Sequence, residues 1–194
     1  MLIPDEVLAR QAALQRRLDV RPNLPGTFRE LCSQVVNALR KGSDLGVLRD
    51  PPHRIFAQLK EAAPPPEVER GAQALVGGSK NFHRSLDLPH FTRDDGGWFD
   101  FAITAREQNG ALELLAYNFE LRFPVSPPGL GQPPPPFVRF DLNPPGHSNA
   151  DRGLRAHVHV GHDDLSVPAP ILSPEEILDL LLYGLRLPAD PRAS

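Results

Sequence analysis

The first half of the chain carries apolar residues at helical spacing, separated by prolines and glycines. This pattern predicts short helices at residues 4–19, 27–42, 52–63 and 67–76. The second helix has the clearest ends, because Thr27 and Glu30 form a capping box and Gly42 is a typical C-terminal stop. We therefore expect residues 1–89 to form a helical region that packs against the rest of the chain or binds a partner.

In the second half of the chain the period changes from helix to strand. Residues 98–106 alternate between apolar and polar positions, and residues 111–123 do so again. Asn109-Gly110 stands between these runs, and this dipeptide is the strongest short-range signal of a β-hairpin. Two further alternating runs follow at 137–142 and 155–160. Together the four runs predict an antiparallel meander of four strands.

The predicted strands place apolar side chains on one face of the sheet. A last helix is expected after Ser173, where Ser-Pro-Glu-Glu forms a capping box with proline at the first helical position. Its wide apolar side, from Ile177 to Leu185, is expected to cover the apolar face of the sheet. We therefore predict an α+β fold, with a site domain at 96–187 and a tail at 188–194.

The opposite face of the predicted sheet is polar. If the four strands align, this face collects Glu120, Arg122, Arg139, Asp141, Arg155, His157 and His159. Histidines at positions i and i+2 of a strand project from the same face, so His157 and His159 point the same way. His147, in the preceding loop, and His162, just after the last strand, are further candidates for the same site.

Three interpretations of this face are open. In the first, His157, His159 and His162 bind a divalent transition metal such as zinc, with His147, Asp141 or Asp163 as further ligands. In the second, no cofactor is needed: one histidine acts as general base, a second histidine or an aspartate acts as acid, and arginine stabilises the developing charge. These are the requirements of RNA transesterification. In the third, the same residues form a solvated or partner-covered surface with weak ion pairs.

The charge of the chain limits how this face can contact nucleic acid. The net charge of the 194 residues is −3, divided into +3 for residues 1–89 and −6 for residues 90–194. A non-specific nucleic-acid binder normally has a strongly basic domain. Any contact with RNA must therefore be local or be shared with a protein partner.

Cysteine content and hydropathy indicate the compartment. Cys32 is the only cysteine, which excludes an intramolecular disulfide and a cysteine-based zinc ribbon. The sequence shows no signal peptide, and its apolar runs are far shorter than the roughly 20 residues of a membrane span. We expect a soluble, cytoplasmic protein that does not enter a membrane.

The run Phe137-Val-Arg-Phe-Asp-Leu142, the loop with His147 and the run Arg155-Ala-His-Val-His-Val-Gly161 together resemble the C-terminal half of TumE-type toxins. That family of bacterial toxin–antitoxin systems has an Arg-Tyr/Trp-Asp strand, a His-containing loop, a Pro-His-His-x-His-Val-Gly element and a terminal helix. The matching positions here are Arg139, Asp141, His147, His157, His159 and Gly161. The resemblance covers about residues 98–186, and the helices before it have no counterpart in the compact family members.

The resemblance implies a toxin or defence-system component that binds or cleaves RNA through its Arg/His/Asp face, with an antitoxin as its protein partner. A second hypothesis is a non-catalytic interaction subunit of a bacterial multi-protein complex, which docks its partner through the helical region. A third hypothesis is a small His-ligated metallo-hydrolase. The three differ in whether the histidines are catalytic, structural or metal-binding.

Overall fold

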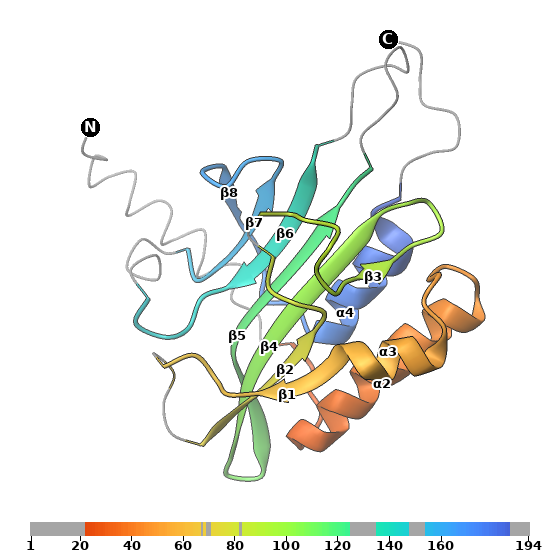
Figure 1. Ribbon diagram of the computed structural model, residues 1–194. Helices are drawn as coiled ribbons and strands as arrows, with labels where there is room; N and C mark the ends of the chain where they lie inside the picture. The colour runs from red at the N-terminus through yellow and green to blue at the C-terminus, as the bar shows by residue number, and fades with distance from the viewer. Residues whose placement is uncertain are drawn as a thin grey trace, which may run out of the picture.

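The computed structural model describes residues 22–66, 68, 71–81, 83–124, 135–147 and 154–186. The helix expected at 4–19 and the tail at 188–194 lie outside these residues. The α+β class is confirmed, because helices pack against an antiparallel sheet of eight strands (Figure 1). The strand order is β1-β2-β4-β5-β6-β7-β8, and β3 pairs with β4. The sheet is thus twice as large as the alternating runs predict.

The central hairpin has the predicted turn. It consists of β4, Trp98–Gln108, and β5, Ala111–Arg122, which pair from end to end. Asn109 and Gly110 connect the two strands with φ angles of 55° and 75°. A two-residue hairpin turn of this hand requires the left-handed conformation at both positions, and Asn-Gly adopts it at low cost. The local chemistry of the turn therefore sets the register of the hairpin.

A β-bulge changes the faces near the turn. The pairing of β4 with β5 shifts between Thr104 and Ala105, so that Leu114 lies opposite Ala105. Leu114 therefore joins the hydrophobic core, whereas the alternation predicts Leu115 for that row. The sequence does not reveal this shift, because the two leucines are adjacent and either one fits an apolar row.

The last strands continue the sheet from β5. They are β6, Phe137–Leu142, β7, Ala156–Val160, and β8, Ser166–Pro168, and each pairs antiparallel with the one before it. β8 is a short edge strand that the sequence does not predict. Leu142 and Ala156 lie opposite each other and belong to the core, as their alternation predicts.

The two predicted helices that precede the hairpin are wrong in part or in full. α3 spans only Pro52–Gln58, and the chain continues directly as β1, Leu59–Ala62. The segment predicted as a helix at 67–76 instead contains β2, Ala72–Gly77, which pairs with both β1 and β4. A short apolar run fits either a helix or a strand by its period. Here the pairing with the long strand β4 decides for the strand.

α2, Phe28–Asp44, begins with the predicted capping box of Thr27 and Glu30 but passes the expected stop at Gly42. The chain leaves the helix later, at Gly46, whose φ is 71°. Gly42 is buried, and a Cβ atom at this position would lie 3.3 Å from the side chain of Leu182. Gly42 therefore permits the close approach of the C-terminal helix rather than ending α2.

The C-terminal helix completes the core. α4, Pro174–Asp179, begins at the predicted capping box of Ser173 and Glu176 and continues as a π-helical turn, Leu180–Gly184. Four of its apolar residues are fully buried: Ile177, Leu178, Leu181 and Leu182. They form one cluster with residues of α2 and with the apolar side of the central strands. α2 and α4 both lie behind the sheet in Figure 1.

Arg93 connects the end of this helix to the sheet. Its side chain is fully buried, and Nη1 donates to the backbone carbonyls of Leu181 at 2.5 Å and Leu185 at 2.7 Å. Its other donors bind Asp95. A cation is favourable at this place because the carbonyl groups at a helix C-terminus carry partial negative charge.

Gly77 marks the closest approach of β2 to the core. It lies opposite Phe101 of β4, and a Cβ atom at this position would overlap the Phe101 ring. We expect Gly77→Ala to lower the free energy of unfolding by about 1–3 kcal/mol, measured by urea denaturation. Gly26→Ala is the control, because its added Cβ meets nothing closer than 3.4 Å. Equal loss of stability in both variants would contradict this account of Gly77.

Candidate functional site

The polar face of the sheet carries two rows of side chains that cross the strands β4 to β7. The first row is Asp100, Glu120, Arg139 and His159, each opposite the next. The second row is Ala102, Asn118, Asp141 and His157. Residues directly opposite each other in an antiparallel pair share one face of the sheet. The register of the strands therefore brings the predicted arginine, aspartate and histidines together.

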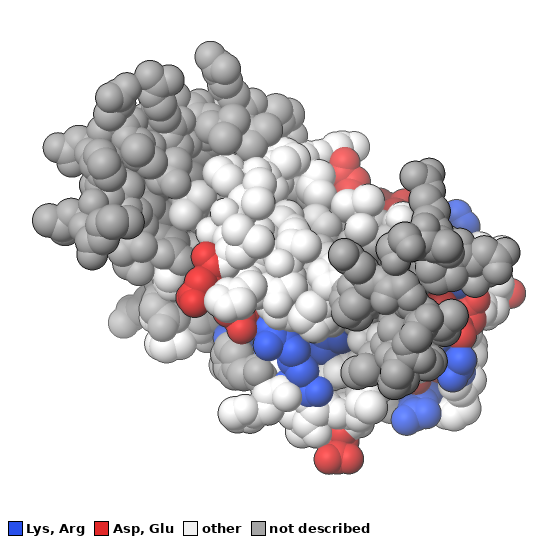
Figure 2. Space-filling view, turned by 90° about the horizontal axis from the view of Figure 1, so that it is seen from above, with Lys and Arg blue, Asp and Glu red and all other residues white. Residues whose placement is uncertain are grey.

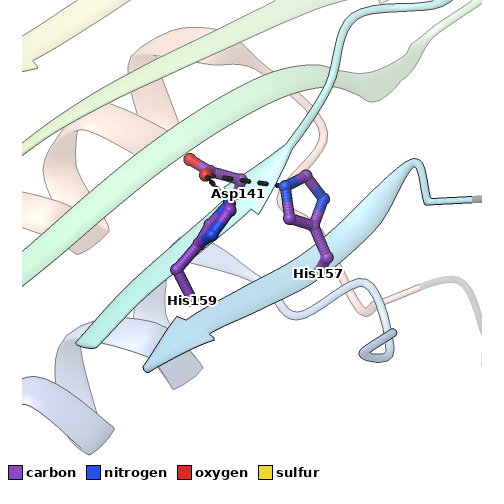
Figure 3. Close-up of side chains that lie close together, drawn as sticks. All are labelled: Asp141, His157 and His159. Atoms are coloured by element: carbon purple, nitrogen blue, oxygen red, sulfur yellow. Dashed lines mark ion pairs between the residues drawn. The ribbon is translucent and has the colours of Figure 1, made fainter. Parts of the chain in front are cut away.

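Asp141 faces both histidines (Figure 3). Its Oδ2 lies 3.4 Å from Nε2 of His159 and 3.7 Å from Nε2 of His157. The two imidazole rings are 4.8 Å apart between centroids and stand at 73° to each other. His157 and His159 are 4% and 7% exposed, respectively. The cluster therefore consists of two buried histidines and a partly buried aspartate, and it is not an open surface.

Hydrogen bonds hold Asp141 on its other side. Asn118 Nδ2 donates to Oδ1 at 2.5 Å, and Arg139 Nε donates to Oδ2 at 2.8 Å. Burial on its own raises the pKa of Asp141. The hydrogen bond from His159 and the charge and hydrogen bond of Arg139 outweigh this, so the pKa lies below its ordinary value. Asp141 is therefore ionised at neutral pH.

The environment of His157 favours the uncharged form of its ring. Burial lowers the pKa of His157 and outweighs the nearby charge of Asp141, while the charges of His159 and Arg139 lower it further. His157 is therefore neutral at pH 7, with a lone pair available on its ring. The ionised carboxylate of Asp141 therefore lies beside the neutral imidazole of His157.

A second cluster is built around the carboxylate of Glu120, which is 5% exposed. Three guanidinium groups donate to it: Arg84 at 2.8 Å, Arg122 at 2.8 Å and Arg139 at 3.3 Å. Arg122 is itself buried and also donates to Asp100 at 2.5 Å. Because Arg122 is occupied inside the protein, it supports the cluster. Arg84 and Arg139 are the arginines that remain partly open to a ligand.

Both clusters line one pocket of about 700 Å³. The sequence-derived candidates that line it are Glu120, Arg122, Arg139, Asp141, His147, His157 and His159. Two candidates lie elsewhere. Arg155 donates to the backbone carbonyl of Leu114 at 3.4 Å, and the side chain of His162 is 70% exposed. The metal set that included His162 is therefore not assembled, and Asp141 stands beside the other two histidines instead.

The pocket also contains two residues that were not among the candidates, Arg84 and Asn118. Asp163, which the sequence suggested only as a further metal ligand, lines it as well. Asn118 was within reach of the sequence pattern, because it stands two residues before Glu120 on the same strand. Arg84 and Asp163 lie in irregular segments, where no period indicates which side chains turn inward.

Charges of both signs are interspersed around the pocket. The charged side chains that line it are Lys80, Arg84, Arg122 and Arg139 with Asp100, Glu120, Asp141 and Asp163. On the face seen from above in Figure 2, the Lys and Arg side chains of the described residues form no continuous basic surface. A protein that binds nucleic acid non-specifically needs a continuous basic surface. The positive charge that can meet a ligand is therefore local, and within the pocket it comes from Lys80, Arg84 and Arg139.

Comparison with models of known protein families, with curated proteins and with solved structures finds no match to this chain. Within the described residues, no helix is long and apolar enough to cross a membrane. The function must therefore be argued from the pocket and its chemistry.

The burial of His157 makes stability depend on pH. Its pKa in the folded chain lies below the ordinary value of 6.5, so the unfolded chain takes up this proton first as the pH falls. The contribution of neutral His157 is complete above that value and is lost as the pH falls toward the folded pKa. We expect the free energy of unfolding to drop as the pH falls below 6.5, and to drop less in His157→Asn, measured by urea denaturation.

His162→Asn is the matched control for this experiment. His162 is exposed and lies outside the pocket, so the variant should keep the pH dependence of the unchanged protein. If His157→Asn also keeps that dependence, burial of His157 is not its cause.

Proposed function

We propose that the pocket on the polar face binds a phosphodiester of RNA and cleaves it by acid–base chemistry. In this proposal the protein is a cytoplasmic, TumE-like toxin or defence-system component of a bacterium, controlled by a protein partner. The observation that carries the proposal is that ionised Asp141, two imidazoles and Arg139 meet in one pocket of about 700 Å³. Base, acid and a charge-stabilising group are the parts that this reaction needs.

The residues divide the reaction as follows. Neutral His157 accepts the proton of the ribose 2′-hydroxyl, whose oxygen then attacks the phosphorus atom. His159 in its protonated form gives a proton to the departing 5′-oxygen, so that a 2′,3′-cyclic phosphate and a free 5′-hydroxyl result. His159 is assigned as the acid because its Nε2 lies nearer to the carboxylate of Asp141, at 3.4 Å. Arg139 balances the negative charge that develops on the phosphoryl oxygens.

The two histidines provide the direct test. We expect His157→Asn and His159→Asn each to lower the rate of RNA cleavage by at least about 100-fold, because general acid–base catalysis contributes that much or more. The rate is measured on a labelled RNA in a gel assay, with folding checked by circular dichroism.

His162→Asn is the control, because it removes a histidine three residues further along that does not line the pocket. It should cleave at the unchanged rate. If the unchanged protein binds a stoichiometric protein partner and neither protein cleaves RNA, the chain is an interaction subunit and the catalytic proposal is wrong.

A second candidate function is favoured by the distances in the histidine cluster. Donor atoms of Asp141, His157 and His159 all lie within 4.8 Å of one another. Two ligand atoms that are about 2.1 Å from a tetrahedral zinc ion are roughly 3.4 Å apart. Oδ2 of Asp141 lies 3.4 Å and 3.7 Å from Nε2 of the two histidines, so the carboxylate has about the spacing to each imidazole that such an ion requires. A metal with three protein ligands can activate water, and the protein would then be a metallo-hydrolase.

Metal analysis separates the two candidates. Under the metal-free mechanism, protein purified without a His-tag should contain less than stoichiometric transition metal, and a chelator should leave RNA cleavage unchanged. Stoichiometric zinc that is lost in Asp141→Asn but kept in His162→Asn would overturn that mechanism and support the metallo-hydrolase. Elemental analysis by mass spectrometry gives the metal content of each variant.

A further inference from the structure

Arg84 reaches the pocket from a strained turn. Its φ of 51° lies in the left-handed region, which is unfavourable for a residue with a side chain. The turn is held by Asn81, a buried residue whose Nδ2 donates to the Ser85 carbonyl at 2.6 Å and whose Oδ1 accepts from the Ser85 amide at 2.9 Å. Non-glycine residues kept in this conformation are concentrated at ligand clamps and active sites. The strain is therefore a reason to ask what Arg84 binds.

The guanidinium of Arg84 is held inside the protein through its Nε and faces the pocket with its Nη2. Its Cζ lies 3.7 Å from the centroid of the Phe137 ring, and its Nε donates to Glu120 at 2.8 Å. Nη2 points to Asp163, at 2.9 Å from Oδ1 and 3.2 Å from Oδ2. Arg84 thus uses Nε and the ring face for positioning, and it offers its outer nitrogen to an anion.

Arg139 is arranged in the same way. Its Nε donates to Asp141 at 2.8 Å, and its Nη1 donates to Oδ1 of Asp163 at 2.6 Å. The outer nitrogens of two arginines from distant parts of the chain therefore meet on one carboxylate oxygen. If that carboxylate left, Glu120 and Asp141 would still hold both guanidinium groups in place.

Asp163 is the weakly held member of this group. Its side chain is 56% exposed, compared with 28% for Arg84 and 16% for Arg139. Ion pairs that are exposed to solvent contribute little to stability, so little is lost when Asp163 moves into water. Free phosphate offers more acceptor oxygens and more charge to the same two arginines than one carboxylate does, and a phosphodiester of RNA offers two non-bridging oxygens and one charge, as the carboxylate does.

We infer that Arg84 and Arg139 form a phosphate subsite in which Asp163 occupies the place of the ligand until a phosphate displaces it. The inference deepens the proposed function, on which it rests for the view that this phosphate belongs to RNA. The subsite adjoins the histidine cluster, because Arg139 binds both Asp163 and Asp141. Asp163 therefore lowers the affinity of the empty pocket for anions and keeps weak anions out.

The test is the affinity for inorganic phosphate, followed by NMR through the Nε–H signals of ¹⁵N-labelled arginines. A competing group that fills a subsite for about nine-tenths of the time weakens apparent binding about tenfold. We therefore expect Asp163→Asn to bind inorganic phosphate about tenfold more tightly than the unchanged protein. The double variant Asp163→Asn with Arg84→Gln should lose this gain.

Asp164→Asn is the matched control. It removes the same charge from the neighbouring residue, whose side chain is 95% exposed, and Asp164 pairs with His162 outside the pocket. Its phosphate affinity should equal that of the unchanged protein. Equal affinities in all three proteins, or an equal gain in both single variants, would overturn the inference.

An RNA decamer distinguishes this inference from the proposed function. Added to Asp163→Asn loaded with inorganic phosphate, the decamer should displace the phosphate and shift the same arginine signals. If phosphate binds tightly but the decamer does not displace it, the subsite exists and serves a small phosphate compound, and the assignment to RNA is wrong.

Discussion

The carboxylate of Glu120 is the interaction on which the pocket depends. It is buried, and it accepts hydrogen bonds from three arginines that come from a loop, from its own strand and from the neighbouring strand. Without it, three guanidinium groups would face one another with too few acceptors, and uncompensated buried charge is among the costliest defects in a protein. Glu120 thus lets positive charge be concentrated beneath an anion site. The carboxylate of the adjoining Asp141 likewise accepts a hydrogen bond from Arg139 and lies beside the two histidines.

The chemistry of the site follows from the sequence wherever it depends on strands. Arg139, Asp141, His157 and His159 could be predicted to meet because side chains alternate along a strand and neighbouring strands pair directly. The Asn-Gly turn likewise determines the register of β4 and β5 from the turn as far as the bulge at Thr104 and Ala105. These features are local or nearly local, so a short stretch of sequence contains the information that determines them.

Features that depend on distant parts of the chain could not be predicted in this way. The segment 72–77 is a strand because it pairs with the edge of β4, and the residues of the segment alone do not indicate this pairing. Arg84 and Asp163 are 79 positions apart in the chain. They meet because the fold brings two irregular segments together. The alternation of side chains predicts Arg155 in the site. However, β7 begins one residue after Arg155, and the side chain of Arg155 contacts Leu114 instead.

The residues that resemble the TumE motif have identifiable physical tasks here. Those with polar side chains, from Arg139 to His159, line the pocket, whereas His162 stands outside both the motif and the pocket. Gly161 has a φ of 70°, and a Cβ there would lie 3.2 Å from Pro135 and Pro136. Only glycine meets both conditions easily. The turn that follows it directs Asp163 back over the arginines.

The burial of Arg93 has a consequence for synthesis of the chain. Its partners, the carbonyls of Leu181 and Leu185, are translated almost ninety residues after it. Until they emerge from the ribosome, the apolar side of the sheet lacks its cover of Ile177, Leu178, Leu181 and Leu182, and a positive charge stands in the unfinished core. Such intermediates expose surfaces that chaperones recognise and that aggregate readily. The core of the nascent protein therefore stays open until the helix that begins at Pro174 has been synthesised.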